Sequence, residues 1–231
     1  MIDLLSTATA KDKRDRNPAV ALLPIGSFEQ HGDFLPLSTD TIVTCSIANQ
    51  IAANHLAMLL PPVTISCSHE HAAWRGTVSI SSQTLNRLVV EVADSVRRSG
   101  IEHVCLISGH GGNYVLSNVV QEYTAVHGPV MSLYPRGQDW ANARVAAGMT
   151  TDNHTDMHAG EIETSILLAA YPMVVRDGNE TADWASDERP HLLTRGMAAY
   201  TSSGVIGRPP LGTAKKGVAA LRHLSDGSAT R

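Results

Sequence analysis

A continuously apolar run that leads directly into polar residues is the feature that most restricts how this chain can fold. Residues 20–25 read VALLPI, which is typical of a strand covered on both faces in a parallel sheet. Gly26 lets the backbone turn, and Glu29 and His31 follow two residues apart, so their side chains can point to one place. Ligands of open α/β sheets bind at the carboxyl ends of strands. We therefore expect an α/β fold with a site after this strand.

The Glu29-x-His31 pair is a weak signal by itself, because polar residues in a loop are more often solvated than bound to a ligand. Asp40 opens a segment with helical spacing, residues 41–56. A helix N-terminus favours a carboxylate, so Asp40 can equally be an ordinary cap. A metal-binding interpretation of these three residues needs partners from elsewhere in the chain.

The rest of the sequence alternates short apolar runs with amphipathic segments. No repeat or linker divides it, so the pattern predicts a single α/β domain over residues 19–231 after an N-terminal arm of residues 1–18. The expected further strands are residues 58–63, 103–108 and 129–134, and the expected further helices are residues 81–99, 114–126, 138–149 and about 213–224.

A histidine between glycines follows the strand at residues 103–108. The turn Gly109-His110-Gly111-Gly112-Asn113 leads into a helix, a geometry that brings a functional group to the top of a parallel sheet. It has neither the P-loop nor the dinucleotide-binding pattern. Glycine leaves space for a ligand to approach, which favours a functional role for His110 over a structural one.

A further pair of candidates precedes an apolar helix that stops near Pro172. His158 and Glu161 are three residues apart and would share one face of a helix, whereas Glu163 would lie off that face. The alternative is an ordinary helix opening with acids favoured by the helix dipole. The cluster around Glu70 and His71 also suits a metal, but a loop of this kind can equally line a pocket.

Composition excludes several classes of protein. The 231 residues carry a net charge of −4, which gives no general attraction to nucleic acid or to an anionic membrane. Neither a long apolar span nor a cleavable leader opens the chain, so we expect a cytoplasmic protein. The three cysteines are far apart and flanked by apolar residues, as expected of small buried side chains.

The candidate ligands together exceed what one ion needs. A catalytic zinc uses three protein ligands and an open position, and two ions about 3.5–4 Å apart share a bridging carboxylate. Oxygen and nitrogen donors suit zinc, manganese or iron. The sequence thus predicts a site for two divalent ions built from Glu29, His31, Asp40, His110 and Glu161.

The sequence resembles the creatininase (creatinine amidohydrolase) family, in order, through most of residues 20–220. The resemblance implies a three-layer αβα sandwich with a mainly parallel central sheet, two metal ions, hydrolysis of a carbon–nitrogen bond and commonly a homohexamer. The motifs that carry it are GSFEQHG at residues 26–32 with LPLSTD at 35–40, SHEH at 68–71 with GTVS at 76–79, SGHGGN at 108–113 and HAGEIETS at 158–165.

The resemblance also implies roles for individual residues. Asp40 would bridge the two ions, with Glu29 and His110 on one ion and His31 on the other. A hydroxide between the ions would attack the substrate carbonyl, and His158 would pass the proton to the leaving nitrogen. We further expect Ser68, His71 and the backbone near Gly111 to contact the substrate.

One departure from the family pattern sets this chain apart from creatininase itself. Gly112 stands where creatininase has a metal-binding carboxylate, and we expect Glu161 to replace that carboxylate, with Glu163 as the next candidate. Only Trp140 lies where tryptophans surround the creatininase substrate. Relatives with the Gly-Gly-Asn turn include deformylases of formamidopyrimidines and the peptidase of the mycofactocin precursor.

These observations favour an amidohydrolase that cleaves a small cyclic amide or a formamide. The main alternative is a metallopeptidase that trims a modified precursor peptide, for which Arg75 or Arg144 would bind the carboxylate of the peptide. A non-catalytic protein with structural histidines is a third possibility. Metal analysis and a hydrolysis screen distinguish the three.

Overall fold

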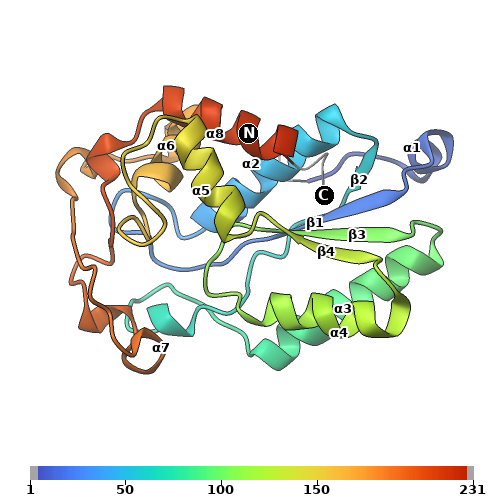
Figure 1. Ribbon diagram of the computed structural model, residues 1–231, viewed down its shortest axis with the longest axis horizontal. Helices are drawn as coiled ribbons and strands as arrows, with labels where there is room; N and C mark the ends of the chain where they lie inside the picture. Colours follow the sequence, from blue (N-terminus) through green and yellow to red (C-terminus); the bar gives the residue numbers. More distant parts are fainter. Residues whose placement is uncertain (1–4, 228–231) are drawn as a thin grey trace.

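The computed structural model describes residues 5–227, and its centre is a sheet of parallel strands (Figure 1). Within these residues the strand order is β2-β1-β3-β4, and every neighbouring pair is parallel. Ile25 at the end of β1 lies opposite Ser108 at the end of β3. The loops that carry the candidate residues therefore leave the sheet at the same edge. The strands are β1 (Val20–Ile25), β2 (Ala57–Leu59), β3 (His103–Ser108) and β4 (Met131–Tyr134).

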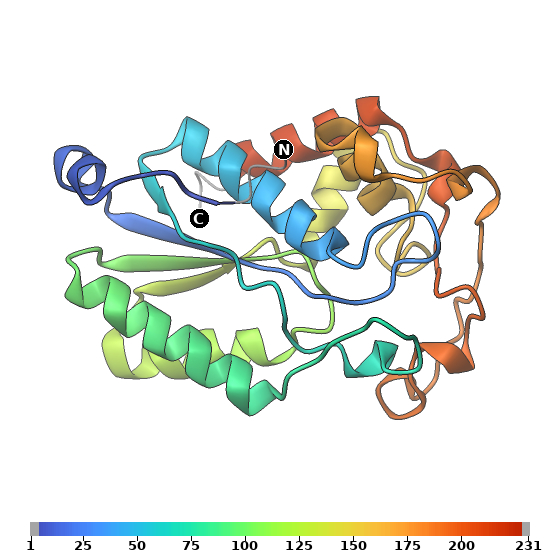
Figure 2. The ribbon, with the colours of Figure 1, turned by 180° about the vertical axis from the view of Figure 1, so that it is seen from behind.

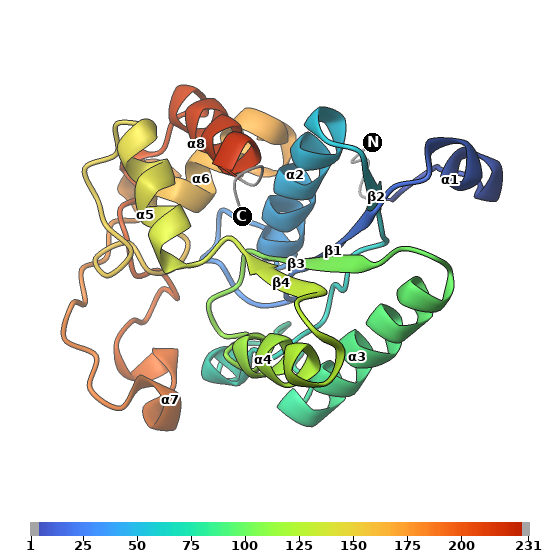
Figure 3. The same ribbon diagram turned by 45° about the vertical axis from the view of Figure 1, so that its right-hand side comes forward.

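Helices cover both faces of the sheet (Figures 1 and 3). This arrangement confirms the expected three-layer αβα sandwich. One face carries α2 (Thr39–Asn54), α5 (Gly137–Ala146), α6 (Glu161–Ala170) and α8 (Ala214–Gly227), and the other carries α3 (Ser82–Arg98) and α4 (Val115–His127). The shorter segments are α1 (Ala10–Arg16), η1 (His69–His71), η2 (Pro172–Val174), η3 (Asn179–Thr181), α7 (Leu192–Arg195), η4 (Met197–Ala199) and η5 (Pro209–Leu211).

The apolar run of β1 is continuous because each face of the sheet has its own core. Leu22 packs in the core beneath α2, α6 and α8, whereas Leu23 and Ile25 pack in the core beneath α3 and α4. Successive strand residues point to opposite faces. A strand with no polar position therefore has to be buried on both sides.

The helix α3 shows how local sequence sets the element bounds. The Ser81 hydroxyl accepts a hydrogen bond from the Thr84 N–H at 3.2 Å and caps the first turn. Gly100, with φ +88°, follows the last turn in a conformation that L side chains rarely adopt. The face toward the sheet buries Leu85, Val89, Ala93 and Val96, at the spacing of an amphipathic helix.

Two segments differ from the sequence prediction. The strand β2 ends at Leu59, before Pro61 and Pro62, which lack the N–H that a ladder needs. The helix α6 begins only at Glu161, because His158 instead forms a β-bridge with Ile206. His158 therefore precedes the helix rather than sharing a face of it.

The N-terminal arm contains α1, which buries none of its residues and projects away from the sheet (Figures 1 and 2). Residues 1–4 of the predicted arm lie outside the described part of the chain. Among residues 5–227, no helix combines the length and the apolar character needed to cross a bilayer.

Candidate active site

Four of the expected ligands meet at the carboxyl edge of β1 and β3. Glu29 and His31 lie in the loop after β1, Asp40 in the first turn of α2, and His110 in the glycine turn after β3. Glu29 Oε1 and Asp40 Oδ2 each lie 3.2 Å from His110 Nδ1. All four side chains are buried. Residues spread over the first half of the chain thus converge as expected.

The Asp40 carboxylate faces two neighbours at once. Its Oδ1 lies 3.4 Å from His31 Nε2, while its Oδ2 lies near His110 and accepts a hydrogen bond from the Ser27 hydroxyl at 2.5 Å. The cap of α2 is Ser38, not Asp40. Asp40 therefore lies between the two imidazoles and is not the cap of α2.

Backbone carbonyls orient the two imidazoles. His31 Nδ1 lies 3.1 Å from the Glu29 carbonyl, and His110 Nε2 lies 2.7 Å from the Cys67 carbonyl. A carbonyl only accepts hydrogen bonds, so these ring nitrogens carry the protons. The other ring nitrogens, His31 Nε2 and His110 Nδ1, face carboxylate oxygens, so a metal ion that displaced their protons would meet nitrogen and oxygen donors together.

Several buried polar atoms of this cluster have no hydrogen-bond partner within residues 5–227. They include both carboxylate oxygens of Glu29 and Nε2 of His31. A buried carboxylate without a partner is strongly unfavourable unless a cation compensates it. The residues present therefore fit divalent cations, and the donor set of oxygen and nitrogen suits zinc, manganese or iron.

Three combinations of residues in the described chain bring potential ligand atoms within 4.8 Å of one another. Two share Asp40, as a two-ion site requires, and the third is a competing arrangement because it reuses Glu29 and His31. The combinations are Glu29, Asp40 and His110; His31, Asp40 and Glu163; and Glu29, His31 and His158.

The expected fifth ligand, Glu161, lies outside this cluster. Its carboxylate accepts hydrogen bonds from the Thr151 hydroxyl at 2.6 Å and from Lys216 Nζ at 2.5 Å. Glu163 lies beside the cluster instead, with Oε1 3.9 Å from His31 Nε2. The preference for Glu161 assumed that a helix already includes His158, and the late start of α6 removes that assumption.

A glutamine that the sequence analysis missed connects the site histidines. The Gln30 carbonyl lies 2.7 Å from His158 Nε2, and the Gln30 amide nitrogen lies 2.9 Å from His71 Nδ1. His158 lies between His31 and His71, with ring centroids 4.2 Å and 4.3 Å away and the rings tilted by 37° and 41°. His158 Nδ1 is left facing Glu29 Oε1 at 3.9 Å. Its position between Glu29 and His31 is the feature of the sequence that could have identified Gln30 as a site residue.

Burial and nearby charges shift the pKa values of these three histidines in different directions. Burial lowers the pKa of His158 well below its usual value, and the charges of His31 and His71 add to this effect. Burial also lowers the pKa of His71 to about 4. Burial opposes the charge on His31 too, but Asp40 outweighs it and raises the pKa of His31 to about 9. His158 is thus a neutral imidazole near neutral pH, and because its Nε2 faces the Gln30 carbonyl, its Nδ1 carries no proton.

The remaining expected residues lie around the cluster. The buried hydroxyl of Ser68 has no partner in the described chain, and Gly111 is exposed. A Cβ at Gly112 would meet Glu70 Oε1 at 2.0 Å and His110 Nε2 at 2.4 Å. The turn therefore leaves no room for a side chain at Gly112 unless Glu70 moves.

Arg144 is not available for a substrate carboxylate. Its NH1 donates to Asp156 Oδ2 at 2.8 Å, and its NH2 donates to the Asp156 carbonyl at 2.9 Å. Asp156 in turn accepts from the N–H of Glu161 at 2.7 Å, at the start of α6. Asp156 and Arg144 thus fix the segment that carries His158, a role that spacing in the sequence did not indicate.

A cavity of about 380 Å³ opens beside the cluster. It combines site residues with apolar side chains, as is typical of small-molecule sites. Its lining includes His110, Gly111, Tyr114, Trp140, Met157 and Glu163.

The parallel sheet, the helices on both of its faces and the buried donor cluster together define a three-layer α/β protein with a site suited to metal ions. The family model for creatininase, described as creatinine amidohydrolase, matches residues 4–230. The chain belongs to the creatininase family, and it is a hydrolase that acts on carbon–nitrogen bonds.

Relatives and solved structures agree with this membership. The mycofactocin precursor peptide peptidase of Mycolicibacterium smegmatis is 33% identical over 240 residues, which cover 98% of this chain and 89% of the relative. A crystal structure of creatinine amidohydrolase (creatininase) has a TM-score of 0.81 at 22% identity, covering 96% of this chain and 93% of that one. The structure described as creatininase Mn has a TM-score of 0.80 at 21% identity, covering 96% and 94%. The chain is a family member that is not creatininase itself.

Proposed function

We propose that this chain is a two-metal amidohydrolase that cleaves an amide bond of a peptide substrate. The observation that carries the proposal is the Asp40 carboxylate, whose two oxygens face His31 on one side and His110 on the other. Nearby, both oxygens of Glu29 are buried and have no hydrogen-bond partner in the described chain. This arrangement has the charge and the geometry for two cations that share one carboxylate.

The proposed ligands divide into two sets. Glu29, Asp40 and His110 would hold one ion, and His31, Asp40 and Glu163 the other, since the donor atoms of each set lie within 4.8 Å of one another. Burial raises the pKa of Glu163 to about 7 in the protein without ions. A cation beside Glu163 would favour its charged form, so metal binding would release a proton there.

The chain's own residues would then guide the reaction. Divalent ions, when bound, would lower the pKa of water and polarise the carbonyl oxygen of the substrate. His158 presents Nδ1 to the site while Nε2 is held by the Gln30 carbonyl, so it can accept a proton and pass it to the leaving nitrogen. Ser68, His71 and the backbone at Gly111 are the proposed substrate contacts.

One comparison favours a peptide over a small ring. The relative at 33% identity over nearly the full chain is named as a peptidase of the mycofactocin precursor peptide. The apolar lining of the cavity, with Trp140 and Met157, is compatible with either substrate. A cyclic amide or a formamide is the second candidate, because the family also includes creatinine amidohydrolase.

Metal analysis combined with hydrolysis assays tests the proposal. We expect about two divalent ions per chain in the purified protein, because the two ligand sets share Asp40. Removal of the ions with a chelator should abolish hydrolysis, and zinc, manganese or iron(II) should restore it. Parallel assays with blocked peptides, cyclic amides and formamides identify the substrate class. Full hydrolysis by protein without metal would refute the proposal.

Location and assembly are part of the proposal as well. We expect a cytoplasmic homohexamer that interacts with neither nucleic acid nor membrane, as the family resemblance and the charge of the chain imply. Light scattering of the purified protein measures the mass of the assembly directly. A monomer at all concentrations would contradict the expected hexamer.

A further inference from the structure

The outermost strand β4 leaves part of its backbone open. In the described sheet β4 has a neighbour only on the β3 side (Figure 3). The Val104 N–H donates to the Val130 carbonyl at 3.0 Å, so Val130 and Ser132 direct their backbone groups toward β3. Met131 and Leu133 therefore direct their N–H and C=O groups to the outer edge of the sheet, where Leu133 is half-buried and Met131 is 6% exposed. An extended chain can pair with such an edge.

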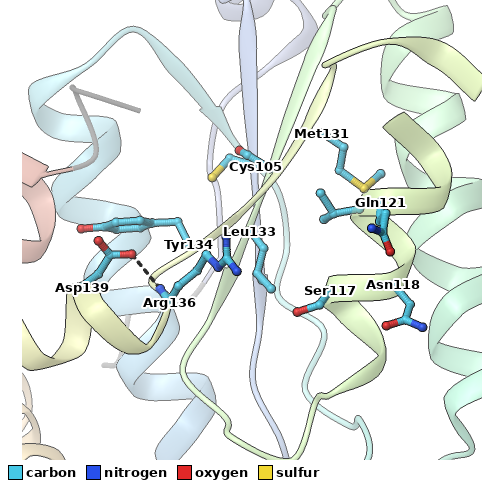
Figure 4. Close-up of a pocket in the computed structure, with 11 residues that line it drawn as sticks. Cys105, Ser117, Asn118, Gln121, Met131, Leu133, Tyr134, Arg136 and Asp139 are labelled. Atoms are coloured by element: carbon cyan, nitrogen blue, oxygen red, sulfur yellow. Dashed lines mark hydrogen bonds between the residues drawn. The ribbon is translucent and has the colours of Figure 1, made fainter. Parts of the chain in front are cut away.

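A groove of about 540 Å³ runs along this edge (Figure 4). One wall is α4, which contributes the exposed polar residues Ser117, Asn118 and Gln121. Arg136 lies at the carboxyl end of the strand, where its backbone N–H donates to Asp139 at 2.8 Å. The groove thus combines strand backbone with polar side chains of α4 and with the apolar residues Val120 and Leu133, a mixed lining that suits an extended peptide.

The groove adjoins the cavity beside the candidate active site. Ser117 and Leu133 line both the edge groove and the cavity of about 380 Å³ that reaches His110 and Glu163. The carboxyl end of β4 also points toward this site, because all the strands are parallel. A chain lying along β4 would arrive at the proposed metal ligands.

We propose that the β4 groove binds an extended segment of the peptide substrate as an added strand and so delivers the scissile amide to the site. This inference rests on the proposed function, and it specifies how the substrate is held. Main-chain pairing with Met131 and Leu133 gives affinity without requiring a particular sequence. The side chains of Ser117, Asn118 and Gln121 contact the segment from the side of α4.

Peptide length provides the first test. The metal-loaded enzyme is incubated with a tryptic digest of serum albumin, and mass spectrometry identifies the peptide cleaved fastest. That peptide is then shortened one residue at a time from the end farther from the scissile bond. We expect kcat/KM to fall about tenfold once the paired residues are lost, as expected of about two main-chain hydrogen bonds. If kcat/KM did not change with peptide length, the proposed binding in the groove would be wrong.

A matched pair of variants on α4 locates the effect. Asn118→Trp fills the groove, whereas Glu122→Trp adds the same side chain at an exposed position of α4 that does not line it. We expect Asn118→Trp to lower the ratio of kcat/KM for the long peptide to that for the shortest one about tenfold, while Glu122→Trp keeps the ratio. Equal ratios in both variants would overturn the proposal. Metal content and thermal unfolding verify that both variants fold.

Amide hydrogen exchange of residues 129–135 separates the peptide from other occupants. If the substrate peptide identified above slows the amide exchange of these residues, the proposal is supported. Protection that instead increases with protein concentration alone would assign the edge to a second copy of the chain and overturn it. If the enzyme hydrolyses a formamide but no peptide, the groove proposal fails and the amidohydrolase stands. If it hydrolyses neither, the proposed function itself fails.

Discussion

Two buried polar regions lie side by side in this protein, and they are built differently. The ion network, formed by Arg144, Asp156, Glu161 and Lys216, pairs each carboxylate with a cation, at 2.8 Å for Asp156 and 2.5 Å for Glu161. In the donor cluster, formed by Glu29, His31, Asp40, His110 and Glu163, the carboxylates face imidazole nitrogens, which can exchange a proton for a metal ion.

The difference shows that burial of charge alone does not identify a site. A buried ion pair with complete hydrogen bonds satisfies itself and can only hold the fold. A buried carboxylate without a partner needs something from outside the chain, such as a metal ion. Glu161 and Glu163 are two residues apart on α6, yet the first belongs to the ion network and the second to the donor cluster.

Replacing each of these two glutamates by glutamine should give the largest difference between the donor cluster and the ion network. We expect Glu163→Gln to lower the metal content from about two ions per chain to about one and the rate about 10³-fold, because an ion supplies several kcal/mol to the reaction. Glu161→Gln, the matched control, should keep both ions. Plasma mass spectrometry and initial rates measure the two effects. Loss of metal from Glu161→Gln alone would reverse the assignment.

Replacement of His158 tests whether a residue beside the donor cluster acts on the substrate. We expect His158→Ala to lower kcat about 10²- to 10⁴-fold, as for loss of a general acid–base, with both ions retained. The exposed His154 gives a control variant, His154→Ala, which should keep the wild-type kcat. If His158→Ala also loses a metal ion, the competing set of Glu29, His31 and His158 holds that ion instead.

The ion network predicts an effect on stability rather than on metal content. Arg144→Met leaves the Asp156 carboxylate buried without its cation, so we expect the free energy of unfolding to fall by about 3–5 kcal/mol. Arg222→Met removes an exposed arginine whose partner Asp226 lies 3.9 Å away, and it should change stability by less than about 1 kcal/mol. Urea denaturation measures both. Equal stability of the two variants would show that the network contributes nothing.

The smallest effect is expected at Lys216. Lys216→Met removes one of the three hydrogen bonds to the Glu161 carboxylate, while those from the hydroxyl and the N–H of Thr151 remain. The lysine side chain is 24% exposed, so water reaches the pair and the loss should be about 1–3 kcal/mol or less. The exposed neighbour Lys215 provides the control, Lys215→Met, in the same denaturation experiment. A destabilisation larger than that of Arg144→Met would contradict this ranking.

Much of the fold was predictable, because local patterns decide it. The apolar runs gave β1 and β3 with their observed bounds, and Gly100 marked the end of α3. The convergence of Glu29, His31, Asp40 and His110 was also predictable, since parallel strands bring their carboxyl ends together. The choice between Glu161 and Glu163 was not, because it depends on where α6 begins.

The apolar runs of the sequence set which residues follow buried strands, and so which acids and imidazoles gather at one edge of the sheet. Which of these side chains lack a hydrogen-bond partner depends on contacts in three dimensions. The bridge between His158 and Ile206 delays the start of α6, and Asp156, held by Arg144, then caps that helix. Contacts between residues this far apart in the chain set the direction of each carboxylate, and spacing along the chain does not encode them.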